Sequence, residues 1–228
     1  MDATADNREK LEAWILEYYA ASAFNTCRRQ KMPSTKGPPV KIMVDPGATP
    51  VAILKPIPVP LHYRAEVKTA LDADVARGVL ERVPPGTPTT WCARMLIQPK
   101  KDGGARRLVD LSALTKVCAR EIHHTRSLFK VAGSIPANTL RTTLDCKDGY
   151  HGVEIREEDR EKTSFLTEWG CYRYRRCPQG LAVSGDGYTK RTDEILSSTP
   201  DKPGMMDIEK IVDDVCQWSD TMSILQSL

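Results

Sequence analysis

Proline placement constrains this 228-residue chain more than any other feature of its sequence. Eight of the sixteen prolines fall between Pro33 and Pro60. Proline lacks the amide hydrogen that a helix interior needs, and it pushes the preceding residue toward extended conformations. Residues 33–60 are therefore predicted to be extended chain lying on a surface, with regular elements on either side.

Both flanks of this segment carry helical periodicity. Apolar residues recur at one-face spacing over Arg8–Ala21, which predicts a helix, and Asp6 with Glu9 forms the pattern of a capping box at its start. Apolar residues recur in the same way over Arg64–Arg77, and Gly78 follows as a typical C-terminal stop. The sequence therefore predicts one amphipathic helix before the extended segment and one after it.

The rest of the chain alternates short strand-like and helical stretches. Runs at Cys92–Gln98 and Arg106–Leu111 are joined by Asp102-Gly103-Gly104, a strong hairpin signal. Further strands are expected at 142–146, 152–155, 163–167 and 172–176, a helix at 187–197, and two strands within 208–218. Because strands and helices mix without strict alternation, we expect an α+β fold.

Several classes of protein are excluded by what the sequence lacks. Seven scattered cysteines form no Cys-x-x-Cys pair, which argues against a disulfide framework and a zinc ribbon, and we expect reduced thiols. No stretch approaches about eighteen uninterrupted apolar residues, so no membrane partner is expected. Residues 1–10 are polar and acidic, which does not fit a cleaved signal peptide. We therefore expect an intracellular, cytoplasmic protein.

Positive charge gathers in one part of the chain. The net charge is only +3, but nine basic residues and three acidic ones lie between Arg94 and Lys130. A local basic surface of this kind suits a phosphate backbone. Charge alone leaves a solvated surface as the alternative.

Three aspartates are candidate metal ligands. Asp145 ends a strand-like run, and Asp213 with Asp214 takes the centre of a predicted tight hairpin between Glu209–Val212 and Val215–Trp218. Adjacent carboxylates repel each other, and a bound dication relieves that cost. Mg²⁺ prefers hard oxygen ligands and keeps sites for water and substrate phosphates, which suits two or three aspartates. An Asp-Asp turn is also a common solvated loop, so the pair alone leaves both interpretations open.

Five blocks of residues occur in a fixed order between residues 37 and 218. They are Gly78-Val79-Leu80-Glu81 with Pro99-Lys100-Lys101-Asp102-Gly103; Arg106-Arg107-Leu108-Val109-Asp110-Leu111; Leu144-Asp145-Cys146-Lys147-Asp148-Gly149-Tyr150-His151 with Lys162-Thr163-Ser164-Phe165; Cys177-Pro178-Gln179-Gly180-Leu181; and Ile211-Val212-Asp213-Asp214. In these blocks the chain resembles the reverse transcriptases of gypsy-type long-terminal-repeat retrotransposons and, more distantly, of retroviruses. The resemblance implies the fingers and an incomplete palm of a right-hand polymerase, with a mixed antiparallel sheet and packed helices.

The same resemblance implies a division of the chain. Residues 1–36 form an N-terminal helix and linker, residues 37–125 and 153–183 form the fingers, and residues 126–152 and 184–228 form the palm. The family continues past the aspartate turn with a thumb and a ribonuclease H domain, whereas this sequence stops at Leu228. We therefore expect the chain alone to be poorly active or inactive, with weakened nucleic-acid binding.

Specific roles follow from the resemblance. Asp145, Asp213 and Asp214 match the catalytic, metal-binding aspartates, which take two Mg²⁺ ions, with Mn²⁺ as an alternative. Five further residues match the nucleotide-binding positions: Lys100, Arg106, Tyr150, Gln179 and Gly180. Lys100 and Arg106 would close on the incoming triphosphate, and Tyr150 would exclude a 2′-hydroxyl by bulk. Gln179 and Gly180 would line the nucleotide pocket.

The implied function is RNA-directed DNA polymerisation by two-metal nucleotidyl transfer to a primer 3′-hydroxyl. The implied partners are an RNA or DNA template with its primer, deoxynucleoside triphosphates, and the thumb, ribonuclease H and integrase of a polyprotein. Because such polyproteins are packaged, virus-like particles are an alternative location to the cytoplasm. A catalytically inactive remnant that only binds nucleic acid is the alternative. Ile211 departs from the family pattern, which has an aromatic residue there, and Gly185-Asp186 replaces the usual proline-bearing helix start.

Overall fold

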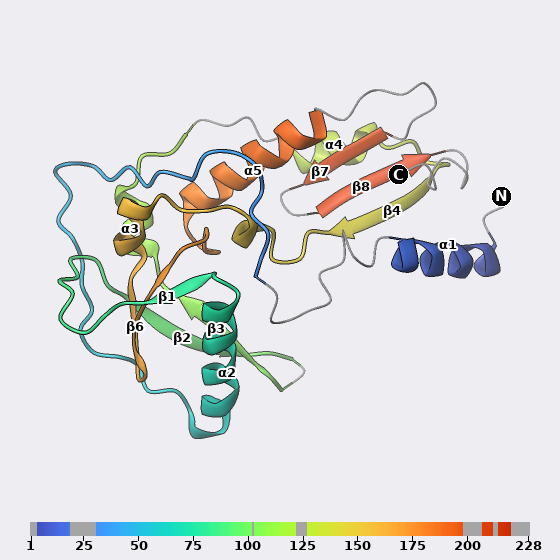
Figure 1. The fold of residues 1–228 in the computed structure, drawn as a ribbon. Coiled ribbons are helices and arrows are strands. Elements are labelled where there is room, and N and C mark those ends of the chain that lie inside the picture. Colours follow the sequence, from blue (N-terminus) through green and yellow to red (C-terminus); the bar gives the residue numbers. More distant parts are fainter. Residues whose placement is uncertain are drawn as a thin grey trace. The chain divides into compact units, whose positions relative to one another are not determined.

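The fold divides into two compact units that the chain enters more than once. The computed structural model describes residues 4–18, 31–101, 103–121, 127–197, 207–211 and 214–219 (Figure 1). One unit comprises Met1–Arg28, His124–Lys147 and Thr192–Leu228, and the other comprises Arg29–His123 and Asp148–Arg191. The predicted boundaries between linker, fingers and palm remain a prediction, and each unit is described by itself.

The larger unit is built on a five-stranded mixed sheet. Its strand order is β1-β6-β5-β2-β3, and only the β2–β5 pair is parallel. The strands are β1 (Leu80–Arg82), β2 (Ala93–Pro99), β3 (Ala105–Val109), β5 (Phe165–Thr167) and β6 (Gly170–Tyr174). The Asp-Gly-Gly signal correctly predicted the β2–β3 hairpin, in which Lys100 N–H donates to Gly104 O at 2.8 Å.

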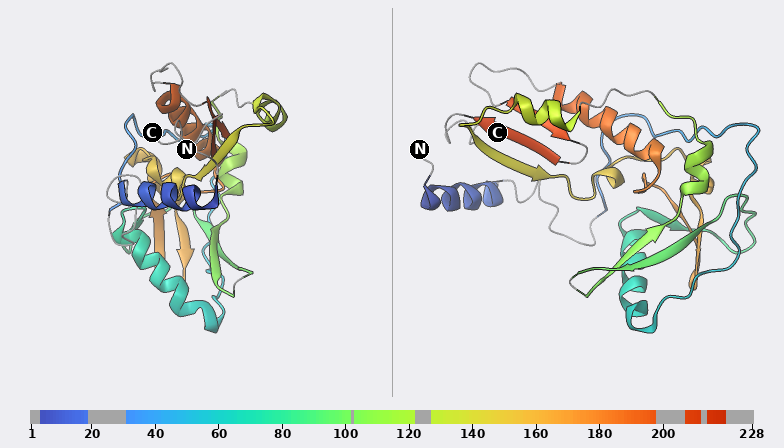
Figure 2. Two further views of the ribbon diagram at one scale, coloured as in Figure 1. Left: turned by 90° about the vertical axis from the view of Figure 1, so that its right-hand side faces the viewer. Right: turned by 180° about the vertical axis from the view of Figure 1, so that it is seen from behind.

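One face of this sheet packs against α2 (Arg64–Ala76), as Figures 1 and 2 show. Val67 and Leu71 of α2 are buried, as are Phe165 and Tyr172 of the sheet. The helix ends where the sequence predicts, because Gly78 takes a φ of +74°, a left-handed conformation that glycine adopts without steric cost.

The proline-rich segment is extended, as predicted. Residues 33–60 contain no helix, and the segment touches the rest of the unit through isolated bridges rather than a continuous ladder: Val40 with Ile155, Val44 with Cys118, and Ala52 with Cys92. A short 3₁₀ helix, η1 (Leu61–Tyr63), connects it to α2. Ile42 is fully buried, so the segment also supplies side chains to the core.

Two predictions for the second half of the larger unit need correction. Residues 152–155 do not form a strand, because η2 (Gly149–Gly152) occupies the start of this stretch and leaves only isolated bridges at Glu154 and Ile155. The helix predicted at 187–197 is α5 (Ala182–Ser197), which begins five residues earlier, since Gly185 is accommodated inside it. The elements α3 (Ser112–Val117) and η3 (Glu157–Thr163) were not predicted.

The smaller unit contains a three-stranded antiparallel sheet in the order β4-β8-β7. The strands are β4 (Leu140–Asp145), β7 (Asp207–Ile211) and β8 (Asp214–Ser219), and α4 (Leu128–Ser134) packs against β7. The predicted hairpin is present, but Asp214 is the first residue of β8 rather than a turn residue, because β8 also pairs with β4 as far as Asp145.

The N-terminal helix α1 spans Ala5–Tyr18, so residues 19–21 of the predicted helix lie outside the described residues. Its cap differs from the predicted capping box: the Thr4 hydroxyl accepts a hydrogen bond from Asn7 N–H at 3.3 Å. Asp6 lies inside the helix and pairs with Lys10 at 2.6 Å. The longest described helix, α5, has 16 residues. In the described ranges no helix is long and apolar enough to cross a membrane.

Candidate active site

Two of the three predicted catalytic aspartates are directly opposite each other in the smaller unit. Asp145 is the last residue of β4 and Asp214 the first of β8, and the two are paired in the antiparallel register. Directly opposed residues have Cβ atoms only about 4.5–5.5 Å apart and point to the same face of the sheet. Asp213 lies outside the described residues. The strand pairing thus joins carboxylates that are 69 positions apart in the sequence.

The environment of this pair suits a hard cation. Both aspartates are exposed, and within the described ranges neither forms an ion pair with a lysine or arginine. An open, oxygen-only donor set is what Mg²⁺ uses when it keeps room for water and substrate phosphates. No cluster of three or more metal-ligating side chains occurs among the described residues, which include Asp145 and Asp214 but not Asp213.

In the larger unit, the predicted triphosphate contacts lie on the β2–β3 hairpin. Lys100 follows the last residue of β2, and Arg106 is the second residue of β3, paired with Gln98. Both side chains are exposed, and neither enters an ion pair in the described part of the chain. The loop is closed by Gly103, which has a φ of +85°. The hairpin therefore carries two cations available to an anionic ligand.

The base of this hairpin is held by a half-buried ionic network that the sequence did not predict. Arg107 of β3 pairs with Asp74 of α2, which also lies 3.7 Å from Arg77. Arg77 in turn donates to Asp148 at 2.7 Å. Because its four members come from α2, β3 and the turn before η2, no local pattern could reveal the network. It fixes Asp148, whose φ of +56° is the only positive value at a non-glycine residue in the described ranges.

His151 lies beside the same network. Burial lowers the pKa of His151 below its ordinary value, while the carboxylates of Asp74 and Asp148 act in the opposite direction. Its Nδ1 atom is buried with no hydrogen-bond partner in the part of the chain that the structure describes. These observations favour a structural role for His151 over a catalytic one.

Tyr150, the predicted sugar gate, stands between this turn and α5. It lies in η2, and its ring packs on the ring of Tyr188 with centroids 4.9 Å apart. Tyr188 is itself buried and fits against Gly149, where an added Cβ would lie 2.7 Å from the tyrosine oxygen. Packing therefore fixes Tyr150, two residues after the left-handed Asp148.

Gln179 and Gly180 form an exposed turn immediately before α5. Gly180 has a φ of +87°, so a residue with a side chain would be strained there. The preceding Cys177 is fully buried, and burial raises its pKa to about 12. All five predicted nucleotide-binding residues thus belong to the larger unit, and the two described aspartates belong to the smaller one.

The fold is that of the reverse transcriptases of retroviruses. The prototype foamy virus protease-reverse transcriptase (CSH mutant) superimposes with a TM-score of 0.79 at 20% identity, over 99% of this chain and 29% of that one. The foamy viral enzyme solved in complex with an RNA/DNA hybrid gives a TM-score of 0.80 at 19% identity, over 98% and 29%. The predicted class, fingers and palm elements of an α+β polymerase fold, is confirmed.

Sequence comparison identifies the family. Residues 98–228, more than half of the chain, match the family described as reverse transcriptase (RNA-dependent DNA polymerase), and the chain belongs to that family. It is 26% identical to the retrovirus-related Pol polyprotein from transposon opus of Drosophila melanogaster, over 76% of this chain and 18% of the relative. For the Pol polyprotein from transposon gypsy of the same species the identity is 28%, over 58% and 12%.

These matches confirm the gypsy-type resemblance. A third relative, the transposon Tf2-7 polyprotein of Schizosaccharomyces pombe, is 30% identical over 41% of this chain and 7% of its own length. The chain thus spans less than a fifth of the length of the curated relatives that it matches.

Proposed function

We propose that this chain contributes fingers and palm to a retroelement reverse transcriptase in which Asp145, Asp213 and Asp214 bind two Mg²⁺ ions. The observation that carries the proposal is the register pairing of Asp145 with Asp214 at one end of the β4–β8 ladder. Two such ions, when bound, activate a primer 3′-hydroxyl and stabilise the leaving pyrophosphate in an in-line displacement. Mn²⁺ offers the same oxygen-preferring chemistry.

The residues of the larger unit would bind and orient the nucleotide. Lys100 and Arg106 would neutralise charge on the triphosphate, since an ammonium and a forked guanidinium both bind phosphate oxygens strongly. Tyr150, fixed by its contact with Tyr188, would exclude a ribose 2′-hydroxyl by bulk. Gln179 and Gly180 would line the pocket next to the base. These roles rest on the family resemblance and on the exposure of the side chains.

The expected partners are a primed RNA or DNA template and deoxynucleoside triphosphates. Structural neighbours have been solved with an RNA/DNA hybrid and with double-stranded DNA, which supports a nucleic-acid duplex as the ligand of this fold. The relatives are polyproteins, so we expect this segment to work beside a thumb, a ribonuclease H and an integrase. A cytoplasmic or virus-like-particle location fits that origin.

Primer extension tests the proposal. The 228-residue chain is incubated with a primed RNA template and deoxynucleotides in Mg²⁺ or Mn²⁺, beside the Asp213→Asn, Asp214→Asn double variant. Because the chain alone is expected to be poorly active, we expect at most weak extension by the unchanged chain and none by the double variant. Equal extension by both proteins would overturn the assignment of the aspartates. Duplex binding without any extension would instead favour the nucleic-acid-binding remnant.

A further inference from the structure

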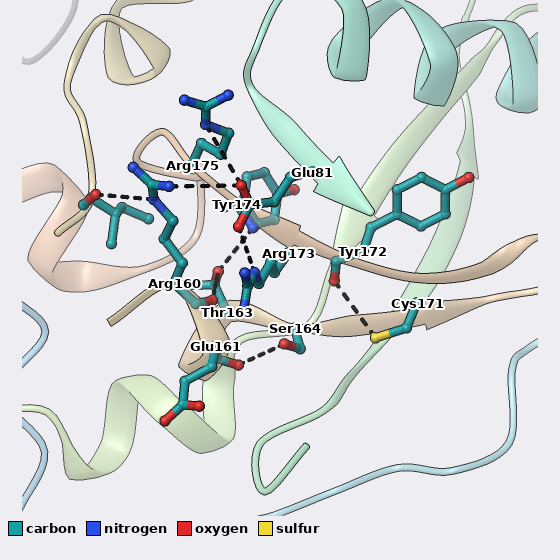
Figure 3. Close-up of polar contacts among 11 residues, drawn as sticks. Glu81, Arg160, Glu161, Thr163, Ser164, Cys171, Tyr172, Arg173, Tyr174 and Arg175 are labelled. Carbon is teal, nitrogen blue, oxygen red and sulfur yellow. Dashed lines mark hydrogen bonds and ion pairs between the residues drawn. The ribbon is translucent and has the colours of Figure 1, made fainter. Parts of the chain in front are cut away.

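Three arginines of the larger unit converge on a single carboxylate, that of Glu81 in β1 (Figure 3). Arg173 of β6, its register partner, donates from Nε to Oε1 at 2.5 Å. Nη1 of Arg160 in η3 and Nε of Arg175 each lie 3.7 Å from Oε2. We call Glu81, Arg160, Arg173 and Arg175 the Glu81 cluster.

The Glu81 cluster carries more positive than negative charge. One carboxylate faces three guanidinium groups, which leaves two positive charges unbalanced within the cluster. In Figure 3 the nearby Glu161 side chain extends away from the guanidinium groups. Burial lowers the pKa of the neighbouring Arg176, its ion-pair partner Glu154 acts in the opposite direction, and repulsion from Arg175 and Arg160 adds to the lowering. An anion bound at the cluster would relieve that repulsion.

Two of the guanidinium groups are held by hydrogen bonds, that of Arg173 to Glu81 and that of Arg160 to Ile155 O at 3.4 Å. For Arg175 it is the backbone that is fixed, by a hydrogen bond to Val79 O at 2.9 Å. The Arg175 side chain is nevertheless 48% exposed, and that of Arg173 is 27% exposed. Arginines that are already ordered lose little further freedom on binding, and their planar fork matches phosphate oxygens.

The position of the cluster in the sheet indicates whether its ligand is a nucleotide triphosphate or a nucleic-acid backbone. Side chains of register partners point to the same face, and alternate residues of a strand share a face. Glu81 and Arg173 therefore lie on the face that carries Arg94 and Arg106, opposite α2. The cluster belongs to the β1–β6 edge and Arg106 to the β3 edge, with three strand spacings, about 14 Å, between β6 and β3. One triphosphate is too short to reach both edges, whereas a nucleic-acid strand can.

We propose that the Glu81 cluster binds the phosphodiester backbone of the unpaired template strand as it crosses this face of the sheet. The proposal rests on the proposed function, because a polymerase always meets its template as an extended polyanion. A purely structural ion-pair network that secures the short strand β1 is the competing explanation. It predicts effects on stability and none on nucleic-acid binding.

Oligonucleotide binding tests the proposal without requiring polymerisation. A short fluorescent oligouridylate is titrated into the 228-residue chain in EDTA, over a range of salt concentrations. We expect Arg175→Gln to raise Kd about five- to tenfold and to reduce the salt slope by roughly 0.7, the value for one phosphate contact on a single strand. Arg82→Gln is the matched control, since it also removes one arginine charge, next to Glu81 in β1 but on the opposite face, beside Tyr172. It is expected to leave the slope unchanged.

A second variant, which makes the Glu81 cluster more positive instead of less positive, keeps the test decisive if Arg175→Gln lowers the stability of the chain. Glu81→Gln retains all three arginines and removes the balancing charge, so it should tighten oligouridylate binding, whereas a structural network predicts no gain. Equal losses for Arg175→Gln and Arg82→Gln, or no gain for Glu81→Gln, would overturn the proposal. Displacement of the oligonucleotide by equimolar pyrophosphate would assign the site to a small anion and overturn it as well. Because this titration is done in EDTA, it does not depend on the metal site, and a failure of the proposed metal site is seen separately in the primer-extension experiment.

Discussion

Asp145 and Asp214 occupy opposite positions at one end of the β4–β8 ladder, with both carboxylates exposed. Strand pairing alone would not favour this arrangement, because like charges directly opposite each other destabilise a sheet. A dication bound between the two carboxylates would offset this repulsion. A sheet that opposes two carboxylates without a cation between them is therefore less stable than one that opposes an aspartate and an amide.

Asp145→Asn is expected to stabilise the chain in EDTA by about 0.2–1 kcal/mol, the size of one cross-strand pair effect. In millimolar Mg²⁺ the unchanged chain should be more stable than Asp145→Asn, because only the unchanged chain gains stability from binding the ion to its folded state. Thermal unfolding in both buffers measures the two effects. Asp6→Asn, a change at an exposed aspartate of α1, is the matched control. An Asp145→Asn protein that is stabilised by Mg²⁺ as much as the unchanged chain would contradict the account.

Gly149→Ala should destabilise the larger unit by about 1–3 kcal/mol, as overpacking does elsewhere. The new Cβ would lie 2.7–2.9 Å from the ring and oxygen of Tyr188, which is buried and in contact with Tyr150. Gly133→Ala is the control, because nothing lies within 4 Å of its Cβ position in α4. Chemical denaturation should show a loss for the first variant and none for the second. Equal stability of the two would mean that Tyr188 moves aside without cost.

The free energy of unfolding should fall as the pH drops below 6.5, in part because of His151. Burial lowers the pKa of His151 in the folded state from the ordinary value of 6.5. Below pH 6.5 the unfolded state therefore binds a proton at this residue more readily than the folded state does, which favours unfolding. One such group contributes at most about 1.4 kcal/mol per pH unit. His151→Gln should flatten the curve below pH 6.5, with the exposed His62, changed to Gln, as the matched control. A curve for His151→Gln as steep as that of the unchanged chain would count against a buried neutral histidine.

Cys171 should be the most readily alkylated of the cysteines in the described ranges. A hydrogen bond from Cys92 lowers the pKa of Cys171 to about 7, and the same contact raises the pKa of Cys92. The rate of iodoacetamide modification should therefore rise with a midpoint near pH 7. Cys92→Ala removes the hydrogen bond and should slow modification at pH 7 by about tenfold or more, because the thiolate is the reactive form. Cys118→Ala should have no effect, and an equal slowing by both changes would contradict the contact.

The elements predicted correctly are those whose signals are local. The β2–β3 hairpin follows from Asp102-Gly103-Gly104, the end of α2 from Gly78, and the extended segment from its prolines. Sequence also placed Asp145 at a strand end. That it faces Asp214 could be expected only from the family resemblance, because no local rule specifies which strands pair.

The features that sequence could not predict depend on contacts between distant segments. β1 has three residues and exists because it pairs with β6, and Glu81 meets Arg173 across 92 positions. The network of Asp74 and Arg107 likewise joins a helix to a strand. Such charges look like ordinary solvated residues in a linear sequence, and only the pairing of the strands shows which of them meet.

Position-resolved cleavage by bound Fe²⁺ tests the central claim most directly. Fe²⁺ replaces Mg²⁺ at oxygen sites, and with ascorbate and peroxide it generates radicals that cut the nearest backbone. The account predicts cuts at two distant places, close to Asp145 and in the β7–β8 connection beside Asp214, both suppressed by excess Mg²⁺ and both lost together in either single Asn variant. Cuts at only one of these places, or cuts that survive Asp145→Asn, would contradict a metal site shared by the two strands.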